Sequence, residues 1–185
     1  MPLENFGSIL NFAENLECQD LAFYELVAAN PACAAYKSAF KELAADVRKN
    51  LKTVQRARRE NVTEMILEPI KDFKRDRFCE ACQGAESMSA AQVLDTAHRL
   101  EVRGENYYSE ASQKIKALPE VARTLKRLGK KRKAHIEKLK TLEHPGTAAA
   151  CPIFQISGKG FVYLYGVETV IQTSLSKLVI FSLFQ

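Results

Sequence analysis

The chain has 185 residues, of which 46% are hydrophobic and 26% are charged, and its formal net charge at pH 7 is +5. This composition is ordinary for a folded globular protein and excludes wholesale disorder, and eight glycines and six prolines are too few for a collagen-like or loop-dominated chain. The length suits one domain, or one domain with an appendage.

Two helices are predicted in the first third of the chain. Helical periodicity runs over about residues 3–29, where Asn30-Pro31 is a stop signal, and resumes over about residues 32–60. The short link between them predicts an antiparallel hairpin. Residues 61–86 have no clean period and predict a long connection.

A second hairpin is predicted after this connection. Its first helix begins near Ser87 or Ser89, either of which is a plausible N-cap, and continues to residue 118. Pro119 is well placed to start the next helix, which runs to residue 143, where His144-Pro145-Gly146 ends it. Two hairpins joined by a long crossover predict an all-α, antiparallel four-helix bundle over residues 1–143, with residues 144–185 as an accessory tail.

An internal repeat supports two related hairpins. Glu17 and Glu101 lie at equivalent positions of the first and third predicted helices, and a tyrosine follows seven residues after each, at Tyr24 and Tyr108.

The apolar seams of the predicted helices carry polar residues near mid-helix. They are Glu17, Asp20, Asn50, Glu101, Arg132 and His135. A buried carboxylate must be paired, hydrogen-bonded, protonated or bound to a metal, so several at one level of a bundle need a common explanation. The seams therefore predict a polar cluster in the core.

Four motifs carry a resemblance to a known family: Glu17 with Tyr24, Glu101 with Tyr108, Phe40-Lys-Glu-Leu-Ala and Leu125-Lys-Arg-Leu-Gly. Over about residues 8–143 the chain resembles the rubrerythrin branch of the ferritin-like superfamily. The resemblance implies a ferritin-like bundle that forms a homo-oligomer, such as a dimer, and handles peroxide or oxygen at a dinuclear iron or manganese centre. In that family a Glu from each of two helices joins a Glu-x-x-His motif from each of the other two.

The chain departs from the ligand pattern that this resemblance implies. The first Glu-x-x-His falls on Val47 and Asn50, so both ligands are missing, and the second falls on Arg132 and His135, so only the histidine remains. Asp20 adds a carboxylate that the motif does not demand. The residual metal site would comprise Glu17, Asp20, Glu101 and His135.

Arg132 offers another explanation for the polar seam. A guanidinium is always charged and its fork of donors matches carboxylates, so we hypothesise that Arg132 takes the charge position of the lost metals and pairs with Glu101, Glu17 or both. An intact dinuclear site, a single or weakly held metal and a metal-free polar core remain as alternatives. Tyr24 and Tyr108 are expected to be core aromatics that would hydrogen-bond the carboxylates of a metal site. Whether the chain is an oxidoreductase or a metal-free binding or oligomerisation module stays open.

Two basic clusters, at residues 56–59 and 123–133, suggest an alternative from another functional class. Basic faces neutralise phosphates, so nucleic-acid binding is the runner-up function. A solvated helix face is the preferred interpretation, because no aromatic residues are interleaved with the charges and no helix-turn-helix pattern is present.

The cysteines and the tail give no indication of a zinc site, a rubredoxin-like centre or a membrane span. Cys79-Glu-Ala-Cys82 stands alone and lacks the partners of a zinc site, so free thiols in a cytoplasmic protein without a secretory signal are expected. The tail has only Cys151, so it cannot form the rubredoxin-like centre of many rubrerythrins. It is β-prone, and polar interruptions at Glu168, Gln172 and Lys177 argue against a membrane span.

Overall fold

The structure is a computed structural model that describes residues 3–61, 70–80, 84–115 and 117–143, together with the backbone of strands at 161–162, 169–174 and 177–182. The chain divides into two compact units, Met1–Glu143 and His144–Gln185, and each is described by itself. In its described part the first unit is helical, and this confirms the predicted all-α class for these residues.

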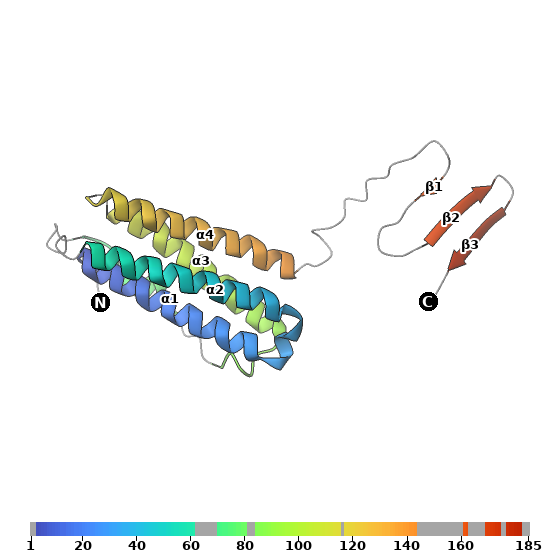
Figure 1. Cartoon of the computed structure of the whole chain (residues 1–185), viewed down its shortest axis with the longest axis horizontal. Coiled ribbons are helices and arrows are strands. Elements are labelled where there is room, and N and C mark those ends of the chain that lie inside the picture. Colours follow the sequence, from blue (N-terminus) through green and yellow to red (C-terminus); the bar gives the residue numbers. More distant parts are fainter. Residues whose placement is uncertain are drawn as a thin grey trace. The chain divides into compact units, whose positions relative to one another are not determined.

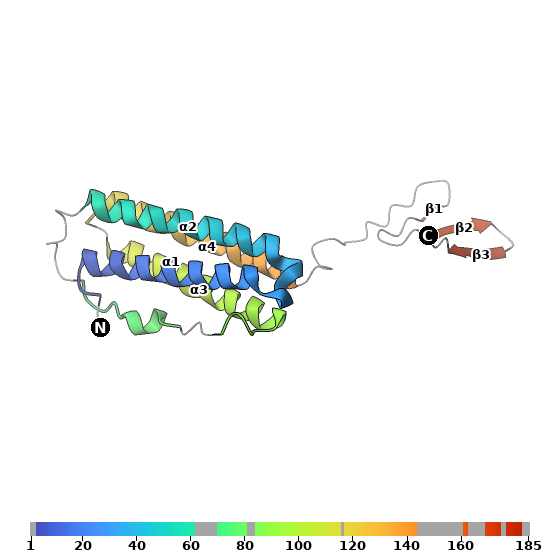
Figure 2. The same cartoon turned by 60° about the horizontal axis from the view of Figure 1, so that its bottom comes forward.

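Four long helices of the first unit lie side by side: α1 (Phe6–Ala29), α2 (Lys37–Glu60), α3 (Ala90–Lys114) and α4 (Pro119–Glu143) (Figure 1). α1 packs mainly on α2 and α3 mainly on α4, while further contacts join α1 to α3 and α2 to α4. The second view confirms this arrangement (Figure 2). α2 ends and α3 begins at opposite ends of the unit, so these two helices run in the same direction.

Side-chain caps fix where two of the helices begin. The Asn5 side chain accepts a hydrogen bond from the backbone N–H of Ser8 at 2.7 Å, and the Ser8 hydroxyl lies 3.2 Å from the Asn5 backbone nitrogen, which donates to it. Ser89 and Gln92 form the same reciprocal capping box at the start of α3. The structure thus selects Ser89 from the two predicted caps.

Two helix boundaries differ from the periodicity. A 3₁₀ helix, η1 (Pro31–Tyr36), precedes α2, which therefore starts later than predicted. α3 ends at Lys114 rather than at residue 118. Pro119 disfavours a helical conformation in the residue before it, and it opens α4, so the chain leaves the helical path ahead of the proline.

The connection between α2 and α3 contributes to the core through its described residues. It contains a short 3₁₀ helix, η3 (Arg75–Phe78). The rings of Phe73 and Phe78 lie 5.6 Å and 5.2 Å from the ring of Tyr107 in α3. The Leu3 backbone N–H donates to the Phe73 carbonyl at 2.8 Å. These contacts attach the crossover to α3 and to the residues that precede α1.

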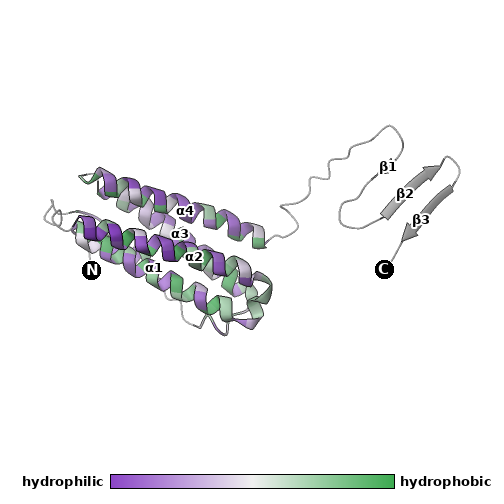
Figure 3. Cartoon of the chain, in the orientation of Figure 1, coloured by the Kyte–Doolittle hydropathy of each residue, from purple (hydrophilic) through white to green (hydrophobic). Residues whose placement is uncertain are grey.

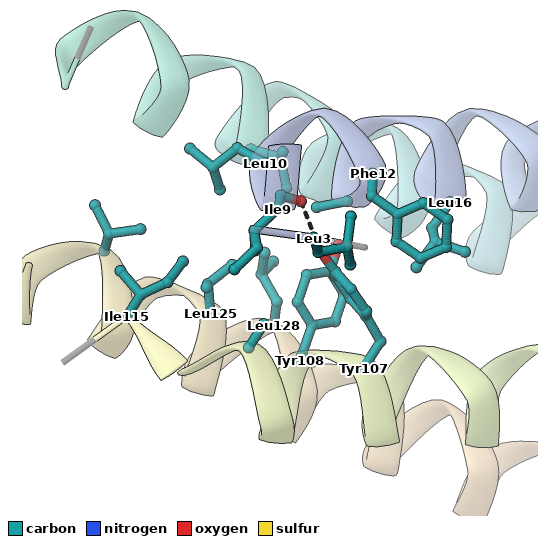
Figure 4. Packing of buried hydrophobic residues seen from close by; sticks show 14 of the residues in the cluster. Leu3, Ile9, Leu10, Phe12, Leu16, Tyr107, Tyr108, Ile115, Leu125 and Leu128 are labelled. Carbon is teal, nitrogen blue, oxygen red and sulfur yellow. Dashed lines mark hydrogen bonds between the residues drawn. The ribbon is translucent and has the colours of Figure 1, made fainter. Parts of the chain in front are cut away.

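The apolar core forms two clusters, one toward each end of the helices. In the first, Ile9 and Leu10 of α1 lie near Leu125 and Leu128 of α4, and the Tyr107 hydroxyl donates to the Ile9 carbonyl at 2.5 Å (Figure 4). The second cluster includes residues Phe23, Phe40, Leu43, Leu100 and Leu139. Hydrophilic residues predominate along the outer sides of α2 and α4 (Figure 3).

The second unit holds three strands: β1 (Phe161–Val162), β2 (Thr169–Ser174) and β3 (Lys177–Ser182). They form an antiparallel sheet in the order β1-β2-β3, with Phe161 opposite Gln172 and Val170 opposite Phe181. Cys151 lies outside the described residues. Within the part of the chain that the structure describes, no helix combines the length and apolar character that crossing a bilayer requires.

Candidate functional site

The polar residues of three helix seams meet between the two apolar clusters. α1 contributes Glu17 and Asp20, α3 contributes Glu101, and α4 contributes Arg132 and His135. In α1 and in α4 the two residues are three positions apart, which places both on one face of the helix. Glu17, Asp20, Glu101 and Arg132 have no exposed surface, and His135 is 6% exposed.

The guanidinium of Arg132 is the centre of this cluster. Its Nη2 lies 2.8 Å from Glu17 Oε2 and 2.9 Å from Asp20 Oδ2, so one nitrogen forms ion pairs with both acidic residues of α1. Its Nη1 donates a hydrogen bond to Glu101 Oε2 at 3.1 Å. The pairing of Arg132 with Glu17 and Glu101 that the sequence suggested is therefore present, and Asp20 is a third partner.

Two tyrosines complete the carboxylate contacts reciprocally. The Tyr24 hydroxyl of α1 donates to Glu101 Oε1 of α3 at 2.6 Å, and the Tyr108 hydroxyl of α3 donates to Glu17 Oε1 of α1 at 2.6 Å. Burial, reinforced by the neighbouring glutamate, raises the pKa of each tyrosine well above its usual value, which keeps both hydroxyls protonated as donors. The two hydrogen bonds are equivalent under the internal repeat, because each tyrosine donates to the glutamate of the other hairpin.

His135 links the cluster to the protein surface. Its Nδ1 lies 3.3 Å from Glu101 Oε1, and its Nε2 lies 3.7 Å from Oδ2 of Asp46, a partly exposed residue of α2.

Asn50, the remaining polar seam residue, does not join the cluster. Its side chain is buried, and its Oδ1 accepts a hydrogen bond from Lys131 Nζ at 3.1 Å. Its Nδ2 has no hydrogen-bond partner among the described residues.

Arg103 of α3 is a member of the site that the sequence reasoning missed. It is 7% exposed and forms a short ion pair with Oδ1 of Asp20. Arg103 lies beside the seam position of Gly104 rather than on it, so the apolar periodicity gives no signal for it. A basic residue adjacent to a glycine on an otherwise apolar seam was the available clue.

The pKa values of Asp20 and Glu101 shift in opposite directions. Burial raises the pKa of Asp20 to about 6, against the lowering effect of Arg132 and Arg103. Burial acts the same way on Glu101, but Arg132 and His135 outweigh it and lower the pKa of Glu101 to about 2. Burial alone would lower the pKa of Arg132, whereas Glu101, Glu17 and Asp20 raise it well above its usual value.

Gly104 makes room for the guanidinium. A Cβ atom at this position would lie 3.2 Å from Arg132 Nε and 3.3 Å from Arg132 Cδ. Both contacts are tighter than a Cβ atom usually makes, so a larger residue at position 104 would require the Arg132 side chain to shift by a few tenths of an ångström. In the internal repeat Gly104 is the position equivalent to Asp20, and the absence of a side chain there leaves space for the arginine.

The donor set does not fit the dinuclear centre that the resemblance to rubrerythrins implies. Val47 cannot be a ligand, Asn50 faces Lys131, and all three carboxylates contact a permanent cation at Arg132. Within the described ranges, no group of three or more His, Cys, Asp or Glu side chains is arranged to hold a metal ion. A metal ion at these carboxylates would have to compete with the guanidinium at close range.

The thiols of Cys18, Cys33 and Cys79 are free, and Cys82 lies outside the described residues.

Comparison with family models, curated proteins and solved structures finds no match to this chain. The functional assignment therefore depends on the residues and their geometry.

Proposed function

We propose that the helical unit is a ferritin-like four-helix bundle of rubrerythrin-type ancestry that works without a metal centre and acts as a binding module through its surface. The observation that carries this proposal is Arg132, whose guanidinium contacts Glu17, Asp20 and Glu101 within 3.1 Å.

The connectivity and the repeat support the ferritin-like ancestry. Two helix hairpins are joined by a long connection, and α2 and α3 run in the same direction (Figure 1). The reciprocal bonds from Tyr24 to Glu101 and from Tyr108 to Glu17 give the two hairpins equivalent roles.

Electrostatics supports a metal-free core. Three carboxylates already face two guanidiniums, those of Arg132 and Arg103. Two divalent metal ions would add four positive charges to a site with too few anions to balance them. Arg132 cannot deprotonate to make room, because its pKa lies well above the usual arginine value.

The burial of the site supports a function at the surface. Glu17, Asp20, Glu101 and Arg132 are inaccessible to solvent, so a substrate has no path to them without the helices separating. Binding sites therefore have to be sought on the outside of the helices. Two grooves on the outside of the described helices lie along α4.

The proposal is tested by supplying iron or manganese during expression and measuring the metal content of the purified full chain by elemental analysis. We expect no metal above that of a chelator-treated control, and no metal-dependent peroxide consumption. Retention of about two metal ions per chain, as in a dinuclear centre, would overturn the proposal. So would peroxide turnover that is lost in Glu17→Gln.

A pair of charge-reversal variants sharpens this test. Arg132→Glu removes the buried cation and supplies a carboxylate, so we expect it to take up more metal than the wild-type protein. Arg123→Glu makes the same change of charge at an exposed position of α4 and should leave metal uptake unchanged. Equal uptake by the two variants would show that overall charge, rather than Arg132, controls metal binding.

A further inference from the structure

The outward side of α4 bears a row of lysines. Lys126, Lys130 and Lys133 are exposed and spaced by four and then three residues, which aligns them on one face of the helix. All three line a groove of about 440 Å³ between α3 and α4. We call this surface the lysine groove.

None of these lysines has an ion pair within the described part of the chain, whereas Arg123 pairs with Glu120 and Lys138 with Glu42. Lys131 donates a hydrogen bond to Asn50. No acidic residue occurs in α4 between Glu120 and Glu137. The positive charge of the groove is therefore largely available to a ligand.

The other wall of the lysine groove is formed by α3. Ser109, Ser112 and Gln113 line it opposite the lysines, together with one acidic residue, Glu105. At the floor, a Cβ atom added to Gly129 would lie 3.4 Å from Tyr108 Cβ and 3.8 Å from the Ser109 backbone nitrogen. α3 and α4 are in ordinary packing contact at this glycine, and α3 places the hydroxyl groups of Ser109 and Ser112 and the amide of Gln113 beside the lysine row.

We propose that the lysine groove binds the phosphate backbone of double-stranded nucleic acid, independently of base sequence. This inference rests on the proposed role of the helical unit as a surface binding module. From Lys126 to Lys133 the row extends about 10 Å along the helix axis. A strand of duplex DNA presents roughly one phosphate per 3.4 Å of its axis, so the row matches about three phosphates. The hydroxyl and amide groups of α3 supply the uncharged contacts to phosphate that such interfaces use.

The lining of the groove argues against a protein or a membrane as the occupant. Protein interfaces have apolar, often aromatic centres, whereas the only nonpolar residues lining this groove are Ala122 and Gly129. A helix that lies on a membrane needs exposed large apolar residues. The one large exposed hydrophobic residue in the described ranges is Leu26, which belongs to α1.

The residues that line each groove also argue against single-stranded nucleic acid as the ligand and against the second groove as the phosphate-binding site. Proteins that bind single strands stack the bases on aromatic side chains, and no aromatic residue lines the lysine groove. The second groove, of about 420 Å³ between α2 and α4, includes Glu60 and Glu120, and its Arg56 is paired with Glu60. Its two acidic residues, against the single Glu105 of the lysine groove, make it the less favourable site for phosphates.

The experiment uses the full chain and a short fluorescent DNA duplex of mixed sequence, with anisotropy measured over a series of salt concentrations. Binding should weaken as salt rises, with a log–log slope of about −0.9 for each phosphate that a cation neutralises. The triple variant Lys126→Gln, Lys130→Gln, Lys133→Gln should reduce the magnitude of that slope by about 2.7, which corresponds to three lost phosphate contacts.

The matched control removes three charges from another helix. Lys37, Lys41 and Lys52 of α2 are exposed and have no ion pair in the described residues. The variant Lys37→Gln, Lys41→Gln, Lys52→Gln should keep the wild-type slope. Circular dichroism spectra of both triple variants establish that each is folded before binding is compared.

Several results would overturn the inference. The first two are the absence of duplex binding at low salt and an equal loss of slope in the two triple variants. The others are tighter binding of a single strand of the same length, competition by polyglutamate as effective as competition by duplex, and preferential binding to phosphatidylserine vesicles. Each of them leaves the metal-free core intact. Metal uptake by the wild-type protein would overturn the proposed function instead, whatever the groove binds.

Discussion

α4 carries positive charge on two opposite sides, and the two sides use it differently. On the inner side, Arg132 is fully buried and surrounded by Glu17, Asp20 and Glu101. On the outer side, the three lysines of the lysine groove are exposed and have no ion pair within the described residues. The comparison teaches that burial and partners, rather than the presence of a basic residue, decide whether a charge serves stability or binding.

The physical reason is the cost of removing charge from water. Both members of a buried ion pair have lost their hydration, so deleting one member leaves the other without solvent or partner. An exposed lysine keeps its hydration, and its removal changes the long-range field more than the stability. The inner and outer sides of α4 should therefore respond to substitution in opposite ways.

The largest difference is expected for Arg132→Met. This change leaves three buried carboxylates without their cation and should lower the free energy of unfolding by about 3–5 kcal/mol. Lys130→Met, on the outer side, should change it by no more than about 0.5 kcal/mol. Urea denaturation followed by circular dichroism measures both values, and similar losses in the two variants would remove the distinction.

Adding Glu101→Gln to Arg132→Met keeps this prediction testable if the single variant does not fold. The second change removes one of the unpaired carboxylates, so the double variant should be more stable than Arg132→Met alone. A double variant that is less stable by the sum of the two single effects would contradict the ion pair between Glu101 and Arg132.

The second prediction concerns pH and involves only the inner side. The pKa of Asp20 rises from 3.8 in its ordinary state to about 6 in the fold, so between these pH values the folded protein holds a proton that the unfolded chain has released. Stability should therefore fall as pH rises from about 4 to about 6, by a contribution on the order of 3 kcal/mol. Asp20→Asn should remove this contribution in urea denaturation at a series of pH values.

Glu101 gives the opposite sign in a lower pH range. Its pKa falls from 4.5 to about 2 in the fold, so its contribution to stability is complete above pH 4.5 and is lost as the pH falls toward 2. A loss of stability below pH 4.5 that persists in Asp20→Asn would separate the two groups. Stability that rises steadily from pH 4 to pH 6 in the wild-type protein would contradict the assignment of Asp20.

The third prediction tests the reciprocal tyrosines. Tyr24→Phe and Tyr108→Phe each delete a hydroxyl that donates to a buried carboxylate, so each should lower the free energy of unfolding by about 1.5–3 kcal/mol. Tyr36→Phe is the control, because Tyr36 is only partly buried and has no hydrogen bond through its hydroxyl to any described residue. Thermal and urea unfolding of the three variants would show a clear gap between the first two and the third.

The smallest effect is expected on the outer side. The triple variant Lys126→Gln, Lys130→Gln, Lys133→Gln should change the free energy of unfolding by no more than about 0.5 kcal/mol per substitution. At low salt it should be slightly more stable than the wild-type protein, because Lys126 and Lys130 are like charges four residues apart on a helix. A large loss of stability would mean that the groove lysines have partners that matter to the fold.

Much of the inner side could be predicted from the sequence, because a seam with regular three- and four-residue spacing identifies what faces a bundle core. Glu17, Glu101, Arg132 and His135 interrupt such seams, and the structure places all four in one cluster. The helix starts at Ser89 and Pro119 were predictable for a similar reason, since capping and proline geometry are local.

The rest depended on contacts that no local pattern encodes. Arg103 reaches Asp20 from a position beside the seam, because its long side chain can extend to a partner that periodicity does not indicate. Asn50 lies on a seam, yet it faces Lys131 instead of the cluster. The β-prone composition of the tail indicates strands, but it does not determine which residues of β2 and β3 lie opposite one another.

The contact between Gly104 and Arg132 has a consequence for how this protein could change over evolution. A glutamate at position 132 would withdraw the side chain that fills the space above Gly104, where a Cβ atom would lie 3.2 Å from the arginine. A larger residue at position 104 would in turn require the Arg132 side chain to shift. The two positions are therefore coupled, and a side chain at position 104 should be accepted more easily once position 132 carries a residue shorter than arginine.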